Sequence, residues 1–356
     1  YWPVYDVWHN AKGMDMPLRV HDVDIWLHPS SFYKNLVALQ NDGYSLDFAS
    51  DRMLASANGY SGTIKVSAKG ASHKVLLVTA CDEMPVKTLQ NIFRIAGEGA
   101  AVIIESFPKD VPGFYNLEKQ RQQLQQLINS VKFHQAKEGL KVSDYGKGKL
   151  IIGNIKDALN YISLHPEGMT IKGLKFIRRK IPDGKYYFIV NNTAEDFDDS
   201  VLLQTQAASV LWMNPLNGNI SLLPAAKNSN GTEVRLQLKS GQSVILKLSG
   251  KKEVAPMHKY ESSTGVPISI DKNEWILHFI RGGPYLPSDK KMKGIEPWTD
   301  FTDDSTTQSF SGTGVYTTSF EIKNKAADYL LQLDKLYESA RIIINGKDAG
   351  LIWSIP

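Results

Sequence analysis

The period of the hydrophobic pattern changes along the chain. Residues 1 to about 163 alternate short apolar runs with segments in which apolar positions recur every three or four residues. Buried strands that alternate with amphipathic helices predict βαβ units and a doubly wound, mostly parallel α/β sheet. The pattern predicts strands at the opening residues and at 44–49, 74–80, 100–104 and 150–152. It predicts helices at 31–40, 88–97, 116–135 and 155–161, with Ser30 or Ser31 and Asn154 as N-caps and Gly43 as a stop.

A strict alternation of apolar and polar positions begins near residue 167 and continues to about 251. This period of two is typical of strands with one buried face, and the intervening Gly-containing pairs favour tight turns. We therefore expect a small antiparallel β-sandwich over 167–251. Its strands are predicted at 174–179, 185–190, 201–204, 209–212, 220–223, 234–238 and 244–248. Residues 251–265, which contain Pro256, are the expected linker to a third domain over 266–356.

Composition and charge narrow the class of protein. The 356 residues are 42% hydrophobic and 22% charged, which is ordinary for a soluble globular protein with two or three domains. The net charge of +4 is spread along the chain without a Lys/Arg block, which argues against a nucleic-acid partner. No apolar run is long enough to suggest a membrane span. The single cysteine, Cys81, excludes an internal disulfide.

Aromatic, histidine and acidic residues gather in two stretches near the start of the chain. We single out Trp8, His9, Asp24, Trp26 and His28 as candidate substrate or interdomain contacts. An indole stacks on the apolar face of a pyranose, and carboxylate and imidazole groups bond its hydroxyls. They follow the first expected strand, at the carboxyl edge of an α/β sheet, where ligands bind. Packing against a neighbouring domain is the favoured alternative, and a metal site is not expected from one histidine and two acids.

Other candidate chemistry is weaker. Trp298 and Trp353 are candidates for sugar stacking, although core or interdomain packing is the commoner role for such residues. Glu105 ends a buried strand, and we interpret it as a capping or interdomain group rather than half of a catalytic carboxylate pair. Cys81 follows a buried strand as a nucleophile would, but it lacks flanking glycines and is best interpreted as a small buried residue.

The C-terminal residues carry a first family resemblance. Residues 309–320, 329–334 and 340–353 are similar to the sugar-binding jelly roll that accompanies family 2 glycoside hydrolases. The resemblance implies a jelly roll over 266–356 that ends before its last strands. Because the opening residues also look like the interior of a strand, we expect the chain to be a fragment of a longer protein.

The whole chain resembles the C-terminal part of glycoside hydrolase family 106, the α-L-rhamnosidases. The order and spacing of several motifs carry the resemblance, at residues 1–8, 39–54, 74–78, 99–104, 176–179, 186–192 and 212–218. The first segment, 1–163, also resembles a class I glutamine amidotransferase-like domain, as found after the barrel in family 42 β-galactosidases. Its Cys81 departs from the amidotransferase pattern, because no His-x-Glu pair follows it.

This resemblance implies an upstream (β/α)₈ barrel in which two carboxylic residues hydrolyse a terminal rhamnose with inversion, with calcium near the site. None of those residues can be placed on this sequence, so we expect no catalytic residue, metal or cofactor here and no hydrolysis by this chain alone. The implied partners are carbohydrate and the barrel, and the implied location is periplasmic or secreted. A non-catalytic carbohydrate-binding or scaffold protein is the alternative, and a thiol-dependent amidohydrolase is a weaker one.

Overall fold

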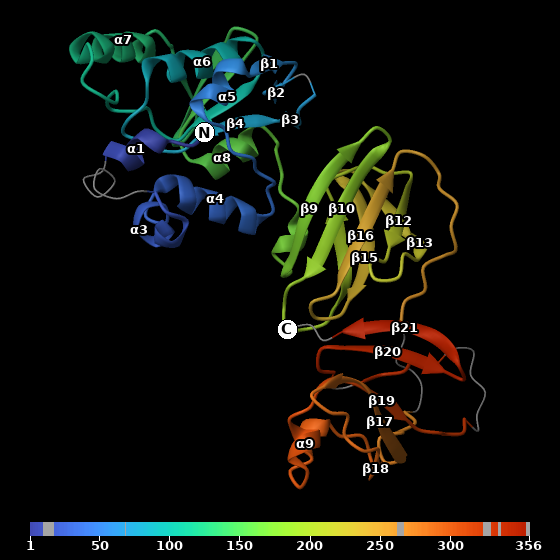
Figure 1. The fold of residues 1–356 in the computed structure, drawn as a ribbon. Coiled ribbons are helices and arrows are strands. Elements are labelled where there is room, and N and C mark those ends of the chain that lie inside the picture. Colours follow the sequence, from blue (N-terminus) through green and yellow to red (C-terminus); the bar gives the residue numbers. More distant parts are fainter. Residues whose placement is uncertain (10–17, 68, 262–266, 323–328, 334–335, 354–356) are drawn as a thin grey trace. The chain divides into compact units, whose positions relative to one another are not determined.

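The computed structural model describes residues 1–9, 18–67, 69–261, 267–322, 329–333 and 336–353 (Figure 1). Contacts divide the chain into two compact units, Tyr1–Lys259 and Tyr260–Ser354. The first unit contains both the α/β segment and the β-sandwich that the sequence predicts. The boundary expected between those two segments stays a prediction.

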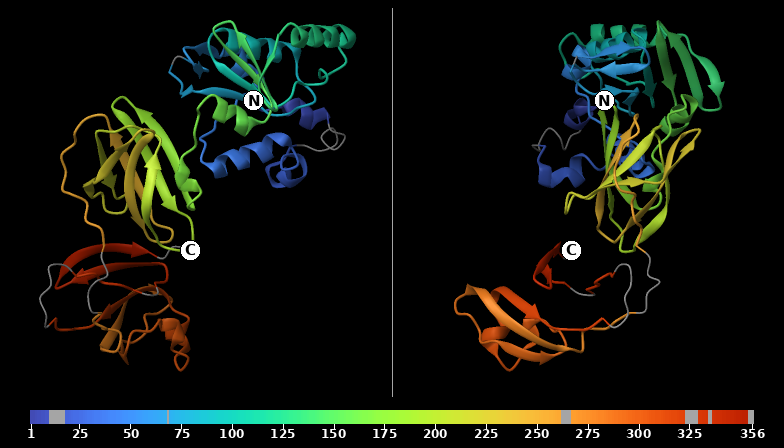
Figure 2. Two further views of the ribbon diagram at one scale, coloured as in Figure 1. Left: turned by 180° about the vertical axis from the view of Figure 1, so that it is seen from behind. Right: turned by 90° about the vertical axis from the view of Figure 1, so that its right-hand side faces the viewer.

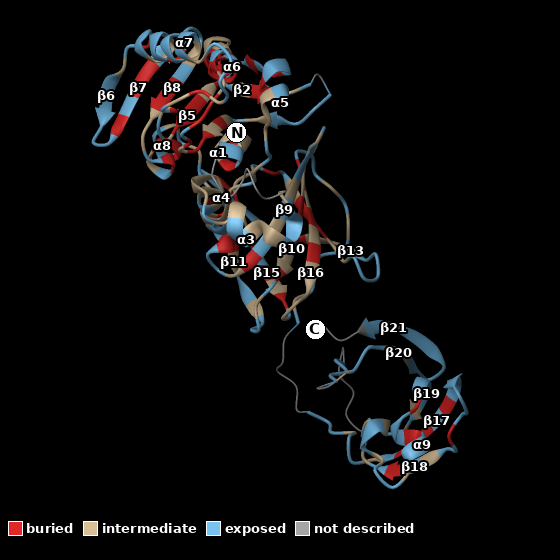
Figure 3. Ribbon diagram, turned by 60° about the vertical axis from the view of Figure 1, so that its left-hand side comes forward, coloured by how far each residue is buried: buried red, intermediate tan, exposed pale blue. Residues whose placement is uncertain are grey.

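A five-stranded sheet organises the first part of unit 1, with the strand order β4-β5-β8-β7-β6. Strands β4 (Val75–Val78), β5 (Ala101–Ile104) and β8 (Gly148–Ile152) pair in parallel, which confirms three predicted strands. Strands β7 (Leu140–Tyr145) and β6 (His134–Lys137) form an antiparallel hairpin that extends the sheet. The hairpin was not predicted, and its polar outer strand is exposed (Figure 3).

Helices cover both faces of this sheet (Figure 1). Alternate strand residues point to opposite faces, so Leu76 and Val102 join one core cluster while Leu77 and Ile103 join another. The first cluster packs under α5 (Asp51–Ser56), α6 (Val86–Gly97) and α7 (Leu117–Asn129). The second packs against α4 (Ser31–Asp42) and α8 (Ile155–Tyr161). The sheet therefore has a layer of helices on each face.

The local signals for helix ends are confirmed at two helices. The Ser30 hydroxyl accepts from the Tyr33 N–H at the start of α4, and Gly43 ends that helix with φ +104°. The Asn154 side chain accepts from the Lys156 and Asp157 N–H groups at the start of α8. Each cap satisfies backbone groups that a helix end leaves without partners.

Three predictions for this segment are wrong. The opening residues form a short helix, α1 (Val4–His9), in place of a strand. Residues 44–49 have no regular structure, because Tyr44 and Leu46 pack on the core without strand pairing and the Tyr44 hydroxyl donates to Leu164 O. Helix α7 ends at Asn129, because the chain turns into β6 from His134.

Short elements complete the segment. The turn η1 (Val20–Asp22) runs into α3 (Val23–Trp26). Strands β1 (Asn58–Tyr60), β2 (Thr63–Lys65) and β3 (Ser72–His73) form a small antiparallel sheet.

The predicted antiparallel strands of the second segment are present, in two sheets that Figure 2 shows from behind and from the side. The larger sheet contains β9 (Leu174–Ile181), β10 (Gly184–Asn191), β12 (Ser209–Met213), β13 (Ile220–Leu223) and β16 (Ser243–Ser249). The smaller contains β11 (Phe197–Leu203), β14 (Ala225–Asn228) and β15 (Gly231–Leu238). The turn η2 (Gly168–Thr170) precedes them, and Tyr187 on β10 is fully buried.

Unit 2 contains a three-stranded antiparallel sheet of β17 (Glu274–Gly283), β18 (Lys290–Lys293) and β19 (Ser311–Thr317). Two short helices, η3 (Trp298–Asp300) and α9 (Ser305–Gln308), lie between β18 and β19 in the chain. Its core consists of Trp275, Leu277, Phe279, Met292 and Phe310. A hairpin of β20 (Ser339–Ile344) and β21 (Lys347–Trp353) follows, and Asn345 and Gly346 at its turn both have positive φ, as a type I′ turn requires.

Candidate functional site

The N-terminal helix is anchored at the carboxyl edge of the α/β sheet. The Tyr1 nitrogen donates to Leu77 O on β4 at 2.6 Å. The Asp6 carboxylate on α1 accepts from the backbone N–H groups of Asp82 and Glu83 at 2.9 and 2.6 Å. Residues just past β4 have no strand partner for these groups, so Asp6 satisfies them and fixes α1 there.

Glu105 performs a similar task at the end of β5. Its Oε2 accepts from the Ala80 N–H at 2.8 Å and from the side chains of Ser31 and Asn35, both at 3.0 Å. The carboxylate therefore joins β4, β5 and α4. The sequence predicted a capping or interdomain group at Glu105, whereas these three contacts all lie within the α/β segment.

The predicted residues fall into separate small groups. Trp8 is 51% exposed and lies edge-on to Tyr5, with ring centroids 5.9 Å apart. His9 Nδ1 lies 3.8 Å from Glu83 Oε1. Asp24 is exposed on α3, and His28 stacks on Tyr33 at 4.2 Å. Of these residues, His9 is the one whose side chain the structure brings beside Glu83.

Trp26 belongs to an aromatic cluster that the sequence did not indicate. Its indole N–H donates to Arg19 O at 2.9 Å, and its ring lies edge-on to Trp2 at 6.2 Å. Trp2 in turn contacts Phe32 at 4.8 Å, and Phe32 contacts Phe48 at 5.5 Å. The cluster packs the N-terminal segment and α3 onto α4, so the Trp26 ring is occupied in packing.

Glu83 is the titratable group at this edge that the sequence missed. It is 7% exposed, and its Oε2 is buried without a hydrogen-bond partner among the described residues. Burial raises its pKa, nearby Asp110, Asp6 and Asp82 raise it further, and His9 opposes them. A carboxyl with a raised pKa retains its proton closer to neutral pH and can donate it.

Comparisons with known proteins place the chain in a family. The family model described as alpha-L-rhamnosidase, of glycoside hydrolase family 106, matches residues 28–223, which is more than half of the chain. The chain belongs to this family. The match covers most of the α/β segment and about two thirds of the β-sandwich.

A solved structure of a rhamnosidase shows the same fold. A rhamnosidase from Novosphingobium sp. PP1Y matches with a TM-score of 0.66 and 17% identity, over 85% of this chain and 29% of that one. The rhamnosidase-family chain thus spans less than a third of that protein. A family 42 β-galactosidase from G. stearothermophilus (TM-score 0.38, 10% identity, 63% and 37% covered) and an exo-carrageenase from Bacteroides ovatus (0.33, 14%, 64% and 28%) are more distant.

Cys81 of this rhamnosidase-family chain is a buried free thiol. Burial raises its pKa to about 12, and the negative charge of Asp6 adds to the effect. A nucleophilic cysteine must reach the thiolate, so this environment supports the interpretation of Cys81 as a packing residue.

The described residues contain no group of three or more His, Cys, Asp or Glu that could hold a metal ion. No helix in the described ranges has the length and apolar character needed to cross a membrane.

The two tryptophans singled out in the third segment differ. The Trp298 indole N–H donates to Phe310 O at 3.1 Å, and its ring packs against Phe279, Phe310 and Tyr316 at 5.8 to 6.4 Å. Trp298 therefore contributes to the core of unit 2, and sugar stacking by it stays a prediction. The Trp353 backbone pairs with Ser339, and its side chain lies outside the described residues.

Proposed function

We propose that this chain is an accessory, non-catalytic region of a longer α-L-rhamnosidase. In this proposal a catalytic barrel elsewhere in the protein removes terminal rhamnose from plant polysaccharide, and calcium acts there. The match to the rhamnosidase family over residues 28–223 supports it. The coverage of 29% of the Novosphingobium rhamnosidase also fits a part of a larger enzyme.

The use of the carboxylates at the sheet edge is the observation that carries the proposal. A glycosidase directs two carboxyl groups at the scissile bond from opposite sides. Here Glu105 accepts from three internal donors and Asp6 from two backbone N–H groups. These acids hold helices against the sheet, which is the work of a supporting domain.

The finer assignments belong to the same proposal. We assign residues 1–163 to an amidotransferase-like domain without thiol chemistry, residues 167–251 to a β-sandwich and residues 266–356 to part of a sugar-binding jelly roll. Carbohydrate and the barrel are the proposed partners, and the periplasm or the extracellular medium is the proposed location. The buried thiol of Cys81 supports the first assignment.

An activity assay with matched proteins tests this function. The purified chain and a longer natural protein that contains it are incubated with an aryl α-L-rhamnoside, and released rhamnose is measured. We expect only the longer protein to release rhamnose. The circular dichroism spectrum of the purified chain should confirm that the chain is folded. Release by the chain itself, abolished by Glu83→Gln but retained in Glu138→Gln, would place a catalytic acid at the β4 edge and overturn the proposal.

A further inference from the structure

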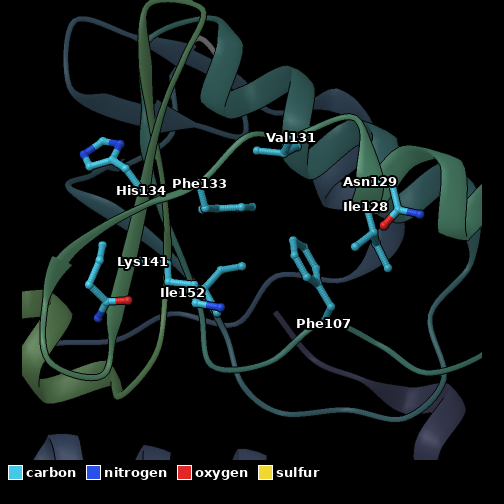
Figure 4. A pocket seen from close by; sticks show the side chains of 9 residues that line it. Phe107, Ile128, Asn129, Val131, Phe133, His134, Lys141 and Ile152 are labelled. Atoms are coloured by element: carbon cyan, nitrogen blue, oxygen red, sulfur yellow. The ribbon is translucent and has the colours of Figure 1, made fainter.

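A cavity lies between the end of α7 and strands β8, β7 and β6 (Figure 4). The cavity measures about 650 Å³, which is within the range of small-molecule sites. Figure 4 shows Phe107, Ile128, Val131 and Phe133 turned toward a common space beside Ile152. None of the residues that the sequence singled out lines it.

Strand register determines which side chains reach this cavity. Ile152 pairs with Lys141, and Lys141 pairs with Gln135, so the three side chains form a row on one face of the sheet. Ile152 packs with the cluster under α6 and α7, which places the row on that face. The neighbouring pair, His134 and Val142, alternates with this row, and His134 also lines the cavity.

The row changes from apolar to polar as it leaves the core. Phe107 and Phe133 meet edge-to-face at 6.0 Å and remain partly exposed, which leaves aromatic surface open to the cavity. Lys141, Gln135 and Asn129 are exposed at the rim. The site therefore combines an apolar floor with polar groups along one side.

Lys141 is the lysine that lines the cavity among the described residues. Lys137 lies 3.6 Å from Asp157, and Lys149 lies 2.5 Å from Asp144, so both neighbouring lysines are paired. Lys141 makes no ion pair within the described ranges, and the lining of the cavity includes no acidic side chain there. An anionic group is the complement that this rim favours.

We propose that this cavity binds one pyranose residue that carries a carboxylate. The apolar C–H face of the ring packs on Phe133 and Phe107, as sugars pack on aromatic rings. The Lys141 ammonium pairs with the carboxylate, and the amides of Gln135 and Asn129 bond the hydroxyls. The site is separate from the Glu83 edge, and binding does not depend on where rhamnosides are hydrolysed.

Titrations followed by isoleucine-methyl NMR of the whole chain test the proposal, because Ile128 and Ile152 both line the cavity. The probes are D-glucuronate, D-glucose, which differs from it only at the C6 carboxylate, and acetate. We expect D-glucuronate to shift both methyl signals in a saturable way. D-Glucose should bind more weakly, and acetate should neither shift the signals nor compete.

Three variants locate the interaction. Lys141→Gln should weaken D-glucuronate binding roughly two- to fivefold and leave D-glucose binding unchanged, since an exposed ion pair contributes modestly. Phe133→Ala should weaken both sugars by about three- to tenfold. Lys119→Gln removes an exposed charge of α7 outside the cavity and should match the parent chain. Unchanged methyl signals elsewhere confirm that each variant is folded.

Several results would overturn the proposal. Ile128 and Ile152 signals that do not respond to D-glucuronate would show that the cavity is empty of sugar. Equal binding of D-glucuronate by the parent chain and Lys141→Gln would remove the role of the cation. Competition by acetate at equal concentration would identify a simple anion site. The titration involves no hydrolysis, so its outcome is independent of the outcome of the rhamnosidase assay.

Discussion

Glu167 shows how a buried charge joins the two segments of unit 1. Its side chain is 1% exposed and accepts from Arg178 at 2.5 Å, from the Tyr187 hydroxyl at 2.8 Å and from the Gln204 N–H at 2.8 Å. Its backbone N–H donates to Gly43 O at 3.0 Å. A carboxylate of this kind is stable in the interior only because each of its oxygens is bonded.

Replacing Glu167 by Gln should be strongly destabilising. The change removes the negative charge and leaves Arg178 without its counterion, which costs about 3 kcal/mol when one partner of a buried pair is lost. Urea unfolding followed by circular dichroism measures the loss. Asp198→Asn, which breaks the exposed pair with Arg235, is the matched control and should cost much less. Equal losses would mean that Glu167 behaves as a surface group.

The raised pKa of Glu83 predicts a pH dependence of stability. The folded chain favours the protonated carboxyl, while the unfolded chain ionises near the ordinary value of 4.5. The contribution of Glu83 to stability is therefore fully present below pH 4.5 and is lost as the pH rises through the raised folded value. Glu83→Gln removes this dependence.

Unfolding midpoints in urea at several pH values between 4 and 8 check this sign. The difference in stability between Glu83→Gln and the parent chain should shift in favour of the variant as the pH rises. The exposed Glu138→Gln provides the control, for which the difference should stay constant. A constant difference for Glu83→Gln as well would contradict the raised pKa.

At the scale of elements, Gly43 connects α4 to the turn that contains Glu167. Its φ of +104° favours glycine, and a Cβ there would lie 2.2 Å from Glu167 O. Gly62, between β1 and β2, also has a positive φ of +75° but no atom within 4 Å of its Cβ position. A comparison of alanine substitutions at the two glycines therefore distinguishes the cost of backbone strain from the cost of steric overlap.

Alanine at both positions tests that separation. Gly62→Ala should cost about 1 kcal/mol from the left-handed backbone alone. Gly43→Ala should cost roughly 2 kcal/mol more, because a backbone carbonyl must shift to admit the methyl group. Thermal unfolding of the two variants measures the difference. Equal unfolding temperatures of the two variants would show that the backbone at the C-terminal end of α4 shifts to admit the methyl group at no measurable cost.

The elements that the sequence predicted have strong local signals. Helices α4 and α8 carry capping side chains, and β5 is a continuous apolar run. The missed elements lack such signals. All four residues of β6 are exposed, so no hydrophobic period marks it, and a Gly139 turn with φ +75° is the one local sign of the hairpin. The short α1 depends on the tertiary contact of Asp6 with Asp82 and Glu83, after β4, which periodicity does not report.

The candidate sites were predictable to a smaller degree. His9 reaches the sheet edge, but the burial of Glu83 arises from packing between segments distant in the chain. The cavity beside Lys141 depends on the register of β6, β7 and β8. The sequence did not predict the β6–β7 hairpin, so it could not predict this register. Side chains of ordinary composition form a site there because three strands align them.

At the scale of the molecule, unit 1 extends beyond the end expected for its sandwich. The sequence places the sandwich at 167–251 and a linker after it. In the structure, Leu222 N donates to Pro256 O at 2.7 Å, and His258 N donates to Leu222 O at 2.9 Å, so residues 256–258 add to the edge of β13. The His258 ring also covers Trp212 at 4.5 Å.

Two truncations of the chain should therefore differ. A fragment ending at Lys259 keeps these contacts, and its sandwich should unfold at the same temperature as in the whole chain. A fragment ending at Lys251 exposes Trp212, loses the Lys247–Glu253 ion pair at 2.7 Å and leaves the edge of β13 open. Its midpoint should fall by at least about 3 °C, since a loss of 1 kcal/mol shifts a unit of this size by about 2–4 °C. Equal midpoints in differential scanning calorimetry would instead identify residues 252–259 as a true linker, because a segment that stabilises the sandwich cannot be removed without a shift.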